Sequence, residues 1–198
     1  MTTQRLSSFA QNVQIAGIPE RDERYFATAD VIAIRDSIRA LITAAIPPAK
    51  IVFGGHPAIT PMIRLVLRNM GLPPKDHVTL YQSRHFQQQF PTDNEAFETI
   101  VLVDAAGSDQ NASLARMREV MIQSHDFVAA IFLGGMEGVE EEYRLFRQIH
   151  PQKPTHPIAS TGAAARFLFD QYCPDRQELL TDLRYLSLFR RLLGIRPA

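Results

Sequence analysis

A glycine-rich turn between an apolar run and an amphipathic segment has the residue types of an anion-binding site. The run over 127–133 predicts a strand buried on both faces. Val139, Tyr143 and Phe146 then recur at helical spacing, so a helix begins at the turn. A helix N-terminus offers unpaired backbone N–H groups and the positive end of the helix dipole, and phosphate is the ligand that suits it best. The turn residues are Gly134, Gly135, Met136, Glu137 and Gly138.

The alternative for this turn is a simple strand-to-helix connection whose helix has a solvated acidic first turn, Glu140–Glu142. Acidic residues favour helix N-termini whether or not a ligand binds there. A single glycine turn therefore does not decide between the two interpretations.

A second junction of the same kind occurs earlier in the chain. The predicted strand 51–53 is followed directly by Gly54, Gly55 and His56, and a helix then opens at Thr60, with Thr60 as the expected N-cap. Two such junctions are much less frequent by chance than one. His56 could meet a phosphate or a base, and the alternative is a loop histidine that caps its own turn.

The remaining pattern alternates strands with helices. Further strands are expected at 13–16, 78–81, 99–103 and 157–159. Further helices are expected from Asp30, as N-cap, to about 45, around 114–121, at 160–168 and at 175–193. This order predicts an α/β sandwich with a largely parallel sheet, in which ligands bind at the carboxyl ends of the strands. The candidate ligand-binding residues at those ends are Gly17, Gly54, Gly55, His56, Ser83, Arg84, Gly134, Gly135, Met136, Glu137, Gly138, Glu141, Thr161 and Gly162.

Composition excludes several classes of function. Lys+Arg and Asp+Glu both number 21, so the net charge of zero does not indicate nucleic acid or an anionic membrane surface as partner. Cys173 is the only cysteine and the histidines lack metal-ligand spacing, so neither a disulfide nor a metal site is expected. No apolar stretch reaches membrane-spanning length and no signal-peptide core is evident, which favours a cytoplasmic protein. The length suits one domain over 1–198.

The turn and its flanks, LGGMEGVEEE at 133–142, resemble the Pro-Gly-Gly-x-Gly-Thr-x-x-Glu hallmark of the SLOG superfamily. That superfamily joins the Smf/DprA proteins and the Lonely Guy phosphoribohydrolases. Here Leu133 replaces the proline, Val139 replaces the threonine, and one residue is added between the second and third glycines. Segments 29–35 and 52–61 look like a SLOG subgroup of prokaryotic conflict systems. The resemblance spans roughly 17–168 and implies a Rossmann-like three-layer sandwich.

The resemblance also implies two uses of the site. Lonely Guy enzymes cleave the N-glycosidic bond of nucleoside monophosphates, whereas other SLOG domains sense ADP-ribose-type nucleotides, some in antiviral defence. Glu142 falls at the last glutamate of the motif, and Arg118 lies near the catalytic arginine of the enzymes. In a hydrolase, Glu142 would hold the ribose or stabilise an oxocarbenium-like centre, and Arg118 would hold the phosphate or the departing group. The alternative pairs Arg118 with a surface acid.

The lost threonine and proline and the added turn residue favour a nucleotide-binding sensor or signalling domain over the hydrolase. A DNA-processing subunit akin to the Smf/DprA proteins is a third hypothesis. No cofactor is expected. The partners expected are a nucleotide, a second copy of the chain through the leucine-rich segment 175–193, and an effector protein, because no output domain is evident. For Arg84, the alternative to phosphate binding is a surface arginine near Asp93 and Glu95.

Overall fold

The computed structural model describes residues 23–46, 49–56, 58–90, 92, 94, 97 and 99–195. The predicted strand at 13–16 and the candidate site residue Gly17 lie outside the described residues.

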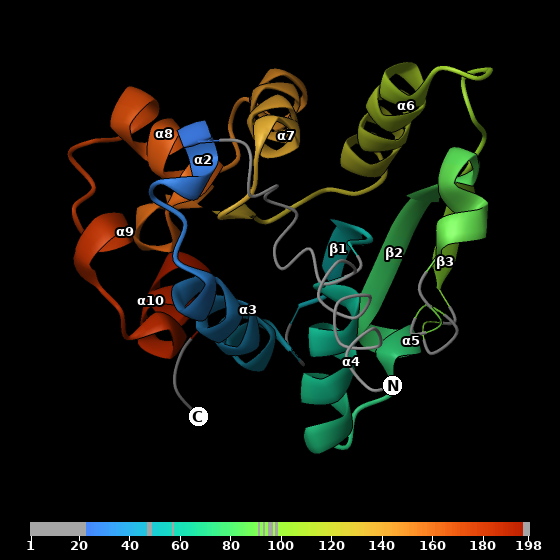
Figure 1. Ribbon diagram of the computed structural model, residues 1–198. Helices are drawn as coiled ribbons and strands as arrows, with labels where there is room; N and C mark the ends of the chain where they lie inside the picture. The colour runs from blue at the N-terminus through green and yellow to red at the C-terminus, as the bar shows by residue number, and fades with distance from the viewer. Residues whose placement is uncertain are drawn as a thin grey trace, which may run out of the picture.

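Two parallel sheets form the centre of the described structure. One contains β1 (Ile51–Gly54), β2 (Val78–Ser83) and β3 (Ile100–Val103) in that order, and the other pairs β4 (Ala130–Leu133) with β5 (Thr155–Ile158). In Figure 1, β1, β2 and β3 lie side by side on the right of the molecule, and helices α8, α9 and α10 lie on the left. The predicted parallel α/β architecture is confirmed, although the described strands fall into two sheets.

The helices connect and cover these strands. They are α2 (Glu23–Phe26), α3 (Val31–Ala45), α4 (Thr60–Asn69), α5 (Pro74–His77), the 3-10 helix η2 (Arg84–Gln89), α6 (Gln110–Gln123), α7 (Glu137–Ile149), the 3-10 helix η4 (Ala159–Thr161), α8 (Ala163–Tyr172), α9 (Glu178–Thr181) and α10 (Tyr185–Leu192). No helix among the described residues is long and apolar enough to span a membrane.

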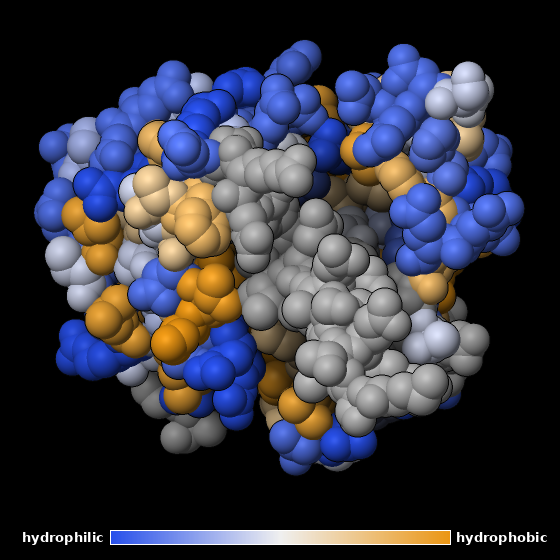
Figure 2. Space-filling view, in the orientation of Figure 1, coloured by the Kyte–Doolittle hydropathy of each residue, from blue (hydrophilic) through white to orange (hydrophobic). Residues whose placement is uncertain are grey.

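The two faces of the sheets are covered by different helices, which makes the three layers of a Rossmann-like sandwich. Helices α3 and α4 cover the first face, where Ile38 and Ile63 pack with Phe53. Helices α6 and α7 cover the second face, where Met121 and Tyr143 pack with Val52 and other strand residues. Phe53 and Val52 are neighbours in β1 and point to opposite faces, as strand geometry requires. The outer surfaces of α6, α7 and α8 are largely hydrophilic (Figure 2).

The predicted start of α3 is confirmed by its cap, but the predicted cap of α4 is wrong. The Asp30 carboxylate accepts a hydrogen bond from the Ala33 N–H at 2.9 Å, which satisfies an amide that the helix itself leaves unpaired. Thr60 instead occupies the first residue of α4, and its hydroxyl donates backward to the His56 carbonyl at 2.9 Å.

The single helix predicted over 175–193 is also wrong, because Asp182 interrupts it. Asp182 has an extended backbone (φ −84°, ψ 99°), and its carboxylate accepts from the Arg184 N–H at 3.0 Å and from the Arg191 guanidinium at 2.6 Å. These local bonds compete with helical ones and divide the segment into α9 and α10. Both helices bury a leucine completely, Leu179 and Leu188, within the protein's own core.

The apolar run that organises the sequence contributes fewer residues to the sheet than predicted. Strand β4 begins at Ala130, and Val128, near the start of the run, remains 66% exposed. Apolar character alone therefore overestimated the length of this strand.

Candidate functional site

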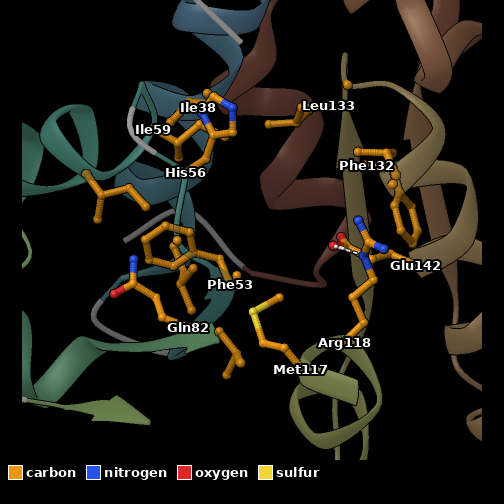
Figure 3. Close-up of a pocket in the computed structure, with 18 of the residues that line it drawn as sticks. Ile38, Phe53, His56, Ile59, Gln82, Met117, Arg118, Phe132, Leu133 and Glu142 are labelled. Atoms are coloured by element: carbon orange, nitrogen blue, oxygen red, sulfur yellow. Dashed lines mark hydrogen bonds and ion pairs between the residues drawn. The ribbon is translucent and has the colours of Figure 1, made fainter. Parts of the chain in front are cut away.

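A cavity of about 530 Å³ lies between β1 of one sheet and β4 of the other. It runs along both strands and is lined by 51–56 on one side and by 131–133 and Gly135 on the other, whereas Gly134 does not line it. Figure 3 shows Phe53 and His56 across the cavity from Phe132 and Glu142. Both predicted glycine turns therefore border one cavity, at the carboxyl ends of β1 and β4.

The turn before α7 is shaped by two glycines with positive φ. Gly134 has φ +51° and Gly135 has φ +81°, a conformation that other residues rarely adopt. The N-cap residue Met136 makes no side-chain capping bond, and among the described residues no acceptor meets the N–H groups of Glu137 or Gly138. The N-terminus of α7 therefore presents two unpaired amides beside the cavity, which Met136 and Gly138 line.

Arg118 from α6 and Glu142 from α7 meet in the cavity wall (Figure 3). The Arg118 Nε lies 3.4 Å from the Glu142 carboxylate, while its Nη1 binds Glu141. A Cβ atom at Gly138 would meet the end of the Arg118 guanidinium, so a larger residue there would displace this side chain. Burial raises the pKa of Glu142, and the nearby Arg118 opposes that shift.

His56 both borders the cavity and caps its own turn. Its Nδ1 accepts a hydrogen bond from the Ala58 N–H at 3.2 Å, which was the alternative interpretation from the sequence. Burial lowers the pKa of His56, so the ring is neutral at pH 7 and acts as a hydrogen-bonding group rather than as a cation.

Thr161 and Gly162 lie behind the glycine turn rather than in the cavity. The Thr161 hydroxyl accepts from the Gly134 N–H at 2.8 Å and donates to the Ile158 carbonyl at 2.6 Å. Thr161 is fully buried, and Gly162 packs so tightly on Thr28 that a Cβ atom would collide with the Thr28 carbonyl. These two residues hold the turn in place and do not line the cavity.

Of the remaining predicted residues, the structure places some in the cavity lining and others outside it. Gly54, Gly55 and Ser83 line the cavity, and the Ser83 hydroxyl also accepts from the His85 N–H at 3.3 Å to cap η2. Arg84 instead pairs with Asp104 at 3.1 Å, an acid other than the two proposed from the sequence. Glu137 and Glu141 do not line the cavity, although Glu141 binds Arg118.

Sequence reasoning missed the apolar and amide lining of the cavity. Phe53, Phe86 and Met117 line it, as does Gln82, whose side-chain oxygen accepts from Asn94 at 2.7 Å. In sequence, a phenylalanine or methionine within a buried pattern is indistinguishable from an ordinary core residue. No group of His, Cys, Asp and Glu side chains in the described part of the chain could hold a metal ion.

A family model described as the SLOG cluster3 family matches residues 24–193. The chain belongs to the SLOG cluster3 family. The match includes both glycine turns, Arg118 and Glu142, and it confirms the SLOG resemblance seen at 133–142. No curated protein matches the chain, and neither does any solved structure. Membership supports a nucleotide-related Rossmann-like domain and names neither a ligand nor a reaction.

Proposed function

We propose that this SLOG domain binds a ribonucleotide or an ADP-ribose-type ligand across the carboxyl ends of β1 and β4, and that it senses the ligand rather than consuming it. The observation that carries the proposal is the meeting of both glycine turns, the unpaired amides of α7 and the Arg118–Glu142 pair at one cavity. Ligands of α/β folds bind where connections diverge at the carboxyl ends of the strands.

Each part of a nucleotide has a matching group in this cavity. The N–H groups of Glu137 and Gly138 suit a phosphate, because no described residue accepts from them and they lie at the positive end of α7. The Glu142 carboxylate is an acceptor for ribose hydroxyls. The side chains of Phe53, Phe86 and Met117 offer an apolar surface to a base.

The charges around Arg118 favour a sensor that binds phosphate through the backbone. Glu141 and Glu142 both pair with Arg118, so the guanidinium charge is already balanced by two carboxylates. A phosphate would therefore gain more from the α7 amides than from this arginine. Such contacts need no particular side chain, so they tolerate the loss of the proline and threonine of the motif.

Calorimetry with ADP-ribose and AMP tests the proposal. The variant Glu142→Gln removes the carboxylate from the cavity, and Glu119→Gln makes the same change at an exposed position of α6. A charge-assisted hydrogen bond contributes about 1.5–3 kcal/mol, so Glu142→Gln should raise Kd by roughly 10- to 100-fold. Glu119→Gln should leave Kd unchanged. The proposal fails if the wild-type protein binds neither nucleotide, or if both variants bind as wild type does.

A nucleoside monophosphate N-glycoside hydrolase is the second candidate, and the raised pKa of Glu142 beside Arg118 favours it. Perturbed carboxylates in clefts are common among catalytic groups. Release of free base from AMP at about 1 s⁻¹ or faster, lost in Glu142→Gln, would establish the hydrolase. Recovery of intact ligand from the calorimeter cell supports the sensor.

A sensor must transmit binding to something else, and we propose a second copy of this chain, or an effector protein, as that partner. Leu183, just before α10, and Leu186, within it, remain 65% and 36% exposed and would contribute to such a contact. We expect light scattering at micromolar concentration to give the mass of a dimer or a larger assembly. A monomeric mass would contradict assembly of copies and leave the effector as partner.

A further inference from the structure

Gln82 is a buried amide in a sheet whose neighbouring side chains are apolar. It lies near the end of β2, between β1 and β3, and is only 5% exposed. Side chains alternate between the two faces of a strand, so Gln82 shares a face with Leu80, which packs in the core under α3 and α4. Burying an amide costs free energy unless its donors and acceptors are paired. A glutamine at this position therefore calls for an explanation.

One end of the Gln82 amide has a partner and the other has none. Its Oε1 accepts a hydrogen bond from Asn94 Nδ2 at 2.7 Å. No described residue accepts from its Nε2, which carries two N–H groups. Among the described residues, the fully enclosed side-chain atoms without a partner are Asn94 Oδ1 and His156 Nε2. Gln82 Nε2 is not one of them, so it is open to the cavity that Gln82 lines.

The glycine turn after β1 leaves room for this amide. Gly55 is not among the glycines with positive φ, so its backbone conformation does not require glycine. A Cβ atom there would lie 2.8 Å from Gln82 Nε2 and 2.5 Å from Leu80 Cδ1, which is closer than van der Waals contact allows. The space that a side chain at Gly55 would need is therefore taken by Leu80 and by the unpaired end of Gln82.

The cavity separates Gln82 from the groups that suit a phosphate and a ribose. In Figure 3, Gln82 lies across the cavity from Arg118 and Glu142. The aromatic side chains of Phe53 and Phe86 line the same cavity. They offer an apolar surface to a flat ring but do not distinguish one such ring from another, whereas a hydrogen bond does. A nucleotide whose phosphate meets the start of α7 and whose ribose meets Glu142 would direct its base toward Gln82.

We propose that the Gln82 amide binds the hydrogen-bonding edge of the ligand's base and makes the site selective for adenine nucleotides. This inference rests on the proposed nucleotide function and adds the residue that recognises the base. With Nε2 toward the cavity, the matching group is a ring nitrogen. Turning over both amides would keep the bond between Gln82 and Asn94 and would present Oε1, which suits an exocyclic amino group. Adenine carries both groups on one edge.

Calorimetry of the wild-type chain with AMP and with indole ribonucleoside 5′-monophosphate isolates this hydrogen bond. Indole is flat and close to a purine in size but has neither a ring acceptor nor an amino group, so it keeps the apolar contacts and leaves Gln82 unpaired. We expect AMP to bind at least about 5-fold more tightly. Equal Kd values, or tighter binding of the indole nucleotide, would overturn the inference and leave the nucleotide site standing. Binding of neither compound would refute the proposed function, and this inference with it.

A matched pair of variants assigns the preference to Gln82. Gln82→Met removes the amide and keeps the length of the side chain, and Gln87→Met makes the same change at an exposed residue of η2 outside the cavity lining. We expect Gln82→Met to bring the ratio of the two Kd values to about 1, and Gln87→Met to keep the wild-type ratio. If Gln82 served only to hold Asn94, its loss would weaken both nucleotides alike and preserve the ratio, which would overturn the inference. If Gln82→Met does not fold, the wild-type comparison still decides.

Discussion

Gly162 shows how a single residue in this chain can set the position of a whole turn. It has φ +71°, and the Thr28 carbonyl occupies the space that a Cβ atom would need. Gly107 has a similar φ of +61°, but nothing lies within 4 Å of its Cβ position. A Cβ atom at Gly107 would therefore cause backbone strain alone, whereas one at Gly162 would cause strain and a collision with backbone.

We expect Gly162→Ala to lower the free energy of unfolding by at least about 3 kcal/mol, since it combines strain with overpacking against backbone. Gly107→Ala should cost only about 1 kcal/mol, from strain alone. Urea unfolding of both variants measures the difference. Equal losses would show that the contact with Thr28 can relax freely.

His156 makes the stability of the protein depend on pH. It is 4% exposed, and its Nδ1 lies 2.9 Å from Arg176 Nη1, which can only donate. The ring must therefore accept at Nδ1 and remain neutral. Burial, together with the charge of Arg176, lowers the pKa of His156 to about 4 from an ordinary value of 6.5.

This shift gives the sign of a pH prediction. Between pH 6.5 and 4 the unfolded chain binds a proton at this residue and the folded protein does not, so stability falls as pH falls. The loss from this residue should reach about 2 kcal/mol between pH 7 and 5. We expect His156→Gln to remove that part of the pH dependence in urea unfolding. His125→Gln, at an exposed histidine, should keep it; equal pH dependence in both variants would contradict the assignment.

At the scale of elements, α10 belongs to the core although it lies near the end of the described chain. It packs along α3, and Leu188 and Phe189 are fully buried there, with Ala44 in the same cluster. We expect Leu188→Ala to lower the free energy of unfolding by about 2–5 kcal/mol. Leu183→Ala, at a leucine that is 65% exposed, should cost less than about 1 kcal/mol.

The same unfolding experiment distinguishes core packing from assembly. If α10 served chiefly as an interface between copies, the two leucine variants would change the midpoint in a way that depends on protein concentration. A midpoint independent of concentration, with the large loss confined to Leu188→Ala, supports the core assignment.

Elements defined by local signals could be predicted from the sequence, whereas contacts between distant segments could not. The cap at Asp30 and both glycine turns depend on neighbours within a few residues, and their predictions agree with the structure. The break at Asp182 is an exception, because its bonds to Arg184 and Arg191 are local and were still missed among the leucines that indicated one continuous helix. The role of Thr161 was missed because it bonds Gly134, which is 27 residues away.

The residues of the candidate site also fall into those that could be predicted from the sequence and those that could not. Arg118 and Glu142 were found through the family motif, and the structure places them 3.4 Å apart in the cavity wall. The pairing of Arg84 with Asp104 and the lining by Phe53 and Met117 depend on how strands and helices come together. Nothing in the local sequence around those residues distinguishes them from surface or core positions.

At the scale of the whole molecule, the site lies between two sheets and takes residues from both. Gly55 and His56 follow β1, while Glu137 and Gly138 open the helix after β4. A ligand that contacts both turns would tie the two sheets together. A ligand held by one turn alone would leave the other turn unaffected.

We therefore expect ADP-ribose, if it binds as proposed, to slow hydrogen exchange at both turns together. At 100 times Kd the bound ligand adds about 2.7 kcal/mol of stability, which should raise Tm by about 5–10 °C in a chain of this size. Amides in α10, which contributes no residue to the cavity lining, should show only the general slowing that follows from the added stability. Additional protection confined to Glu137 and Gly138 would mean that α7 alone holds the ligand. In that case the phosphate contact stands, and the turn at Gly55 has no part in binding.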